Sequence, residues 1–82
     1  MTKSDIFTGL KDILAGIKPK MDLSSVTLES GLYEDLGLDS LSMLLISLAI
    51  EQVFNVQMDG QVRFTEVGEV VDYVFVHQDN AF

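Results

Sequence analysis

The first part of the chain has apolar residues at three- and four-residue intervals, the spacing of one face of an α-helix. Thr2 or Ser4 precedes this series as a candidate N-cap, and Pro19 follows it, where a helix can no longer continue. The series therefore predicts a first helix that ends near Lys18. Its apolar face consists of Ile6, Phe7, Leu10, Ile13, Leu14 and Ile17.

Residues 20–39 form a long connection in which Ser, Thr, Gly and Asp alternate with apolar residues. So many apolar side chains argue against disorder, and we expect an ordered loop that packs against the helices. We expect a short turn over residues 32–36, and Gly37 to supply a backbone angle that other residues resist. The apolar residues are Met21, Leu23, Val26, Leu28, Leu32, Tyr33, Leu36 and Leu38.

A second helix is predicted over residues 40–54, with Asp39 as its N-cap and Asn55 at its exit. Thr65 is the predicted cap of a last helix. The β-branched residues of that segment also suit a strand, but their helical spacing and the lack of a partner strand favour a helix. Its apolar face consists of Val67, Val70, Val71 and Val74.

Residues 57–64, between these two helices, are ambiguous. The Asp59-Gly60 pair indicates a turn, whereas Val62 and Phe64 could anchor one or two helical turns. The whole pattern predicts an all-α fold, a small four-helix bundle of three main helices plus a short third helix or turn. A long loop separates helices 1 and 2, and residues 1–82 form one domain.

The predicted second helix has two apolar arcs when it is drawn at about 100° per residue. The first arc is assigned to the core and contains Met43, Ile46, Ile50 and Phe54, with Val53 beside it. A surface helix needs one such arc, so the second implies either a helix buried nearly all round or an exposed stripe that docks a partner. The candidate docking residues are Leu41, Leu44, Leu45, Leu48 and Glu51.

Charge and composition narrow the possible functions. With 13 acidic and 5 basic residues, the chain has a formal net charge of −8, which disfavours nucleic acid and anionic membranes and favours basic partner surfaces. Solubility alone would also explain this charge. The chain has no cysteine and a single histidine, His77. One histidine near the C-terminus argues against a His-based metal site and against a catalytic triad with Ser40.

Two further expectations concern metals and membranes. Glu34, Asp35 and Asp39 lack the ligand series of a calcium loop, so we expect no metal site. The apolar run of residues 41–50 is too short to span a bilayer, and no secretory signal is evident. We therefore expect a cytoplasmic monomer without stable membrane insertion.

The most informative string is EDLGLDSL, residues 34–41, directly before the apolar run. It places Ser40 at the expected start of a helix, where unpaired N–H groups and a partial positive charge favour an anion such as a phosphate ester. The string, its position midway along the chain and the order of helices around it resemble the acyl carrier protein family. The resemblance extends from about residue 4 to residue 76 and is weakest after Phe54.

The resemblance implies a 4'-phosphopantetheine arm attached to Ser40 by a phosphopantetheinyl transferase that uses coenzyme A. Such an arm holds an acyl intermediate as a thioester and presents it to acyl-transferring or acyl-activating enzymes of fatty-acid, polyketide or related lipid biosynthesis. The protein itself would not be an enzyme. Asp39 would belong to the attachment motif as well as cap the helix. Because the chain has no cysteine, the arm would supply the thiol.

The second helix departs from the usual pattern of fatty-acid carriers, which place exposed acids on it. At matching positions this chain has Ser42, Leu45, Gln52 and Val53, and Glu51 alone keeps an acidic role. This difference indicates a specialised carrier with a dedicated partner. Two alternatives remain open, an aminoacyl or peptidyl (including D-alanyl) carrier and an unmodified acidic helical interaction module. An acyl chain shielded between helices would contact Ile46, Ile50, Val62, Val67 and Val71, which equally suit a plain core.

Overall fold

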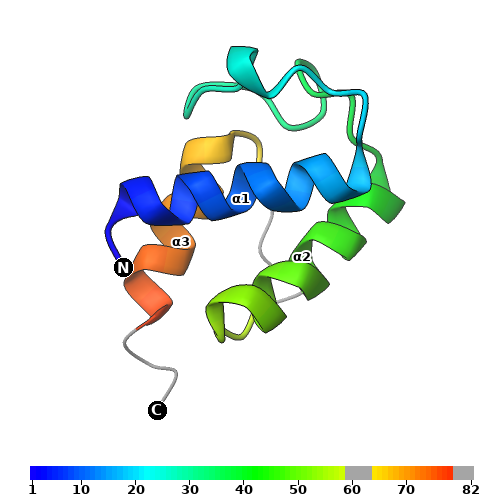
Figure 1. Ribbon diagram of the computed structural model, residues 1–82. Coiled ribbons are helices and arrows are strands. Elements are labelled where there is room, and N and C mark those ends of the chain that lie inside the picture. The colour runs from blue at the N-terminus through cyan, green and yellow to red at the C-terminus, as the bar shows by residue number, and fades with distance from the viewer. Residues whose placement is uncertain (59–63, 79–82) are drawn as a thin grey trace.

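The computed structural model of the protein describes residues 1–58 and 64–78. These residues form three α-helices, α1 (Lys3–Ile17), α2 (Ser40–Phe54) and α3 (Val67–His77), with a short 3-10 turn, η1 (Leu23–Ser25), in the long connection between α1 and α2 (Figure 1). The all-α prediction is confirmed. The predicted short third helix or turn falls largely on residues 59–63, outside the described residues, and residues 55–58 adopt no regular structure.

Helix α1 is the central element, because it packs against both α2 and α3 (Figure 1). Each helix turns one apolar face into a single core, and each fully buried aliphatic side chain stabilises the fold by about 1.5–3 kcal/mol relative to an exposed one. The buried residues of the three helices are Ile6, Leu10 and Leu14 on α1, Ile46, Ile50 and Phe54 on α2, and Val67, Val70, Val71 and Val74 on α3.

The helix ends follow local capping rules with one exception. Thr2, rather than Ser4, caps α1 in a reciprocal pair with Asp5, and Asn55 ends α2 in the left-handed conformation. The predicted cap of α3 is wrong, because that helix begins one residue later, with Glu66 at the N-cap position. The Glu69 carboxylate instead accepts the amides of Thr65 and Glu66 at 2.6 and 3.1 Å.

The long loop is ordered, as predicted, because backbone hydrogen bonds tie it to the start of α3. The amides of Val67 and Gly68 donate to the carbonyls of Ser30 and Leu28, at 3.0 and 2.7 Å. These loop carbonyls satisfy first-turn N–H groups of α3, so the helix needs no hydroxyl cap from Thr65. The expected turn over residues 32–36 is present, and Gly37 has a φ of 66°.

None of the helices in the described ranges is both long and apolar enough to cross a membrane.

Two glycines of α1 provide a matched test of the α1–α2 packing. A Cβ atom at Gly9 would lie 2.7 Å from Cζ of the buried Phe54 ring, whereas one at Gly16 would meet open space. Gly16→Ala is expected to raise the free energy of unfolding by about 0.5–1 kcal/mol, the usual gain of alanine within a helix. Gly9→Ala is expected to lower it by about 1 kcal/mol, because overpacking exceeds that gain. Urea denaturation measures both changes, and equal stabilisation by both substitutions would contradict the packing.

Candidate functional site

Ser40 is the first residue of α2 and is exposed. Asp39 precedes it as the N-cap, with an extended backbone, and its Oδ1 atom accepts the Ser42 amide at 2.8 Å. Within the described part of the chain, no group hydrogen-bonds to the Ser40 hydroxyl. The hydroxyl is therefore accessible at the start of a well-capped helix, as the sequence predicts.

The first turn of α2 also has donors to spare. The Ser42 amide is used by Asp39 and the Met43 amide donates to the Asp39 carbonyl at 2.9 Å, but the amides of Ser40 and Leu41 have no acceptor among the described residues. Such free N–H groups, together with the helix dipole, make a helix start a favourable place for a phosphate group. The residues present thus fit a phosphate ester on Ser40.

Asp39 stays ionised next to this serine. The hydrogen bond from the Ser42 amide is the main cause that holds the pKa of Asp39 below its usual range, and the Ser42 hydroxyl and the charge of Lys18 act in the same direction. A negative cap and a positive side chain from the end of α1 therefore both lie near the start of α2. The sequence reasoning did not identify Lys18 as part of this site, because its proximity to Asp39 depends on how α1 and α2 are arranged.

The position of α2 is set by the segment that precedes it. The Leu38 amide donates to the Leu32 carbonyl at 3.1 Å, and the Leu32 amide donates to the Thr65 carbonyl at 2.8 Å. Both leucine side chains are buried, with exposed fractions of 4% for Leu38 and 2% for Leu32. Ser40 therefore lies two residues after Leu38, which is linked through Leu32 to the entry of α3.

Helix α2 is buried on one side only, so a helix buried all round is the wrong interpretation. Leu41 is 64% exposed and Leu48 is 48% exposed, whereas Ile46 and Ile50 are 2% and 1% exposed. Contiguous apolar surface of this kind is typical of interaction sites. We call the exposed side the leucine face, which consists of Leu41, Leu44, Leu45 and Leu48.

Three details of the predicted arcs need correction. Val53, placed beside the core, is 56% exposed, because Phe54 occupies the position against α1 in the last turn. Met43, assigned to the core, is only half-buried, although it packs against the core cluster. Ser42, compared with exposed acids of other carriers, is buried, because it lies on the same side of the helix as Ile46 one turn later.

Glu51 and the predicted walls of an acyl cavity have structural roles. The Glu51 carboxylate is half-buried and accepts the Met58 amide at 3.0 Å, so it is already engaged within the protein. Four of the proposed wall residues, Ile46, Ile50, Val67 and Val71, belong to the one core cluster. The fifth, Val62, lies outside the described residues.

Comparison with known proteins places this sequence in a family. A family model described as "Phosphopantetheine attachment site" matches residues 9–74. An acyl carrier protein of Clostridium acetobutylicum is 32% identical over 76 residues, which cover 90% of this chain and 97% of that protein. This chain belongs to the acyl carrier protein family. An acyl carrier protein of Acidothermus cellulolyticus is 38% identical over 79 residues, covering 90% of this chain and 89% of the relative. An acyl carrier protein of Thermotoga maritima is 33% identical over 75 residues, which cover 89% of this chain and 91% of that protein.

Membership in the family, together with the structure, confirms three of the predictions made from the sequence. Acyl carrier proteins are carriers and not enzymes, their cofactor is phosphopantetheine, and the fold is a small helical bundle. The matched segment contains Ser40 and all of α2.

The two sides of α2 are expected to respond differently to truncation. Ile50→Ala should lower the free energy of unfolding by about 2–5 kcal/mol, because it leaves a cavity in the core. Leu48→Ala should change it by less than about 1 kcal/mol, because the side chain is already half in water. Chemical denaturation of the two variants measures the difference. A large loss at both positions would show that the leucine face is buried in solution.

Proposed function

We propose that Ser40 bears the phosphopantetheine arm and that the protein carries an acyl group on it as a thioester. The observation that supports this most directly is the exposed Ser40 hydroxyl at the capped start of α2, inside the segment matched by the phosphopantetheine family model. The arm supplies a flexible thiol, which the chain lacks because it has no cysteine.

The residues around Ser40 have separate roles in this proposal. Asp39 holds the first turn through the Ser42 amide, so the serine presents its oxygen from a fixed backbone. The free amides of Ser40 and Leu41 face the place where the phosphate of the arm would be bound, and their partial positive charge favours it. The protein itself performs no chemical step. A phosphopantetheinyl transferase would transfer the arm from coenzyme A.

The leucine face is proposed as the surface that partner enzymes recognise. It begins one residue after Ser40, and its Leu45 stands where carriers of the fatty-acid type have an acid. With Glu51 engaged by Met58, recognition on α2 depends on apolar contact more than on charge. The net charge of −8 favours basic surfaces around that contact. We infer a specialised carrier with a dedicated acyl-transferring or acyl-activating partner.

The family also supports a proposal about the wider setting. We propose a monomeric, single-domain, cytoplasmic carrier in fatty-acid, polyketide or related lipid biosynthesis. The relatives cited are all acyl carrier proteins, which favours an acyl cargo over an aminoacyl or peptidyl one. The exposed leucine face supports an unmodified interaction module as the second candidate, distinguished by a partner that binds equally well when Ser40 is replaced.

Intact-mass measurement tests the attachment residue. After incubation with coenzyme A and a broad-specificity phosphopantetheinyl transferase, the protein should gain the mass of one phosphopantetheine group. Ser40→Ala should gain none. Ser47→Ala is the matched control, because it removes another hydroxyl of α2, one that bonds the Met43 carbonyl at 2.9 Å, and should gain the full mass. Added mass on Ser40→Ala, or none on the unsubstituted protein, would refute the proposal.

A further inference from the structure

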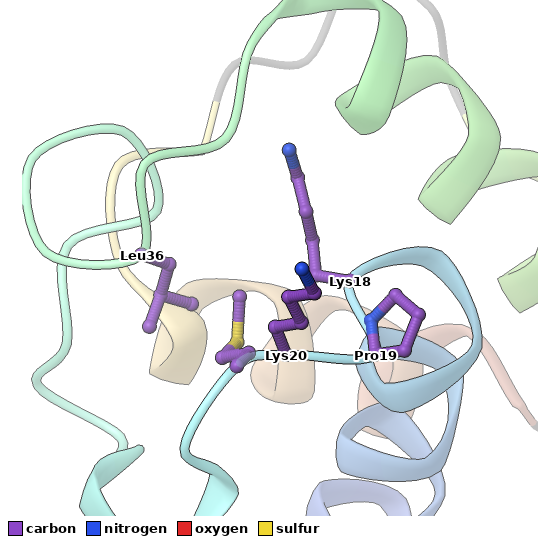
Figure 2. A pocket seen from close by; sticks show the side chains of 5 residues that line it. Lys18, Pro19, Lys20 and Leu36 are labelled. Carbon is purple, nitrogen blue, oxygen red and sulfur yellow. The ribbon is translucent and has the colours of Figure 1, made fainter.

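A pocket of about 380 Å³ lies beside the start of α2, a volume within the range of small-molecule sites. It is lined by Lys18, Pro19, Lys20, Met21 and Leu36, and in Figure 2 the Lys18 side chain extends upward, away from Leu36 and Pro19. Met21 and Leu36 are half-buried and pack against the core. The pocket therefore has a mostly apolar lining, and two lysine side chains border it.

This pocket concentrates positive charge in an acidic protein. Two of the five basic residues line it, in a chain of net charge −8. Other lysines are engaged elsewhere, since Lys3 pairs with Asp72 at 3.1 Å and the Lys11 ammonium lies 4.9 Å from the centre of the Phe7 ring. Within residues 1–58 and 64–78, neither Lys18 nor Lys20 forms an ion pair. The two free ammonium groups favour an anionic occupant.

The pocket is within reach of Ser40. Leu36 precedes Ser40 by four residues, so their Cα atoms are at most about 14 Å apart. The Leu36 amide donates to the Gly31 carbonyl at 3.0 Å, which fixes that wall. In Figure 1 the end of α1, which leads into Lys18, lies next to the start of α2. The effect of the Lys18 charge on Asp39 agrees with this proximity.

We infer that the arm on Ser40 rests in this pocket when no partner is bound, with its phosphate near Lys18 and the branched methyl groups of its pantoyl unit against Met21 and Leu36. This inference rests on the proposed function. A phosphodiester followed by a short branched apolar unit matches the order of charge and apolar surface from the start of α2 into the pocket. Lys20 contacts the polar remainder of the arm. The pocket thus holds the arm itself, and a partner enzyme must draw it out.

Methyl NMR of the unmodified and modified protein tests the inference. With labelled methionine methyl groups, attachment of the arm should shift the Met21 signal and give a nuclear Overhauser contact between Met21 and the paired methyl groups of the arm. Met1 provides an internal control, because α1, about 22 Å long, separates it from the pocket. Its signal should not move.

Charge variants complete the test. The double variant Lys18→Gln/Lys20→Gln should lose the contact, whereas Lys11→Gln, which removes a charge within α1 and away from the pocket, should retain it. An unchanged Met21 signal on an arm-bearing protein would overturn the inference, as would equal loss of the contact in the two variants. Intact mass separates the two proposals. A protein with no added mass refutes the proposed function and this inference with it, whereas added mass without the contact refutes only the inference.

Discussion

The backbone of Leu32 connects the two helix starts on which the site depends. Its amide donates to the Thr65 carbonyl at the entry of α3, and its carbonyl accepts the Leu38 amide before α2. Its side chain is buried, so these groups have little access to water, and leaving one of them unpaired would cost about 1–3 kcal/mol. The pairing therefore holds a long loop in one conformation and fixes where α2 begins.

Because the start of α2 is fixed, one side of the helix faces the core and the other side faces water. The buried side, led by Ile46 and Ile50, anchors the helix against α1, while the leucine face remains in water beside Ser40. In the proposed attachment site the serine is therefore held in place by the fold, and the arm alone would move when a partner draws it out of the pocket. The pocket between the end of α1 and Leu36, the proposed resting place of the arm, belongs to the same part of the fold.

Local signals in the sequence were sufficient for the helices. The 3.6-residue spacing, Pro19 after α1 and Asp39 before α2 each act within a few residues, so they could be interpreted without the fold. The start of α3 was misplaced because its first N–H groups are satisfied by Leu28 and Ser30, which are distant in sequence. The role proposed for Ser40 rests on a family resemblance, since an Asp-Ser pair alone indicates only a helix cap.

The pocket of Lys18, Lys20 and Leu36 could not be predicted from local sequence signals, because it forms only where two segments separated in the sequence meet. The angular positions of residues around α2 also gave the wrong burial for Val53, because they describe a single helix and not the extent of the helix that packs against it.

Native-state hydrogen exchange of the Leu32 and Leu38 amides tests most directly whether the loop fixes the start of α2. If the two hydrogen bonds tie α2 to α3, both amides should be protected to within about tenfold of the Ile50 amide in the centre of α2, because all three then open only with the core. Exchange of the Leu32 and Leu38 amides at the rate of an unstructured peptide, while Ile50 stays protected, would contradict a fixed loop and a fixed attachment serine.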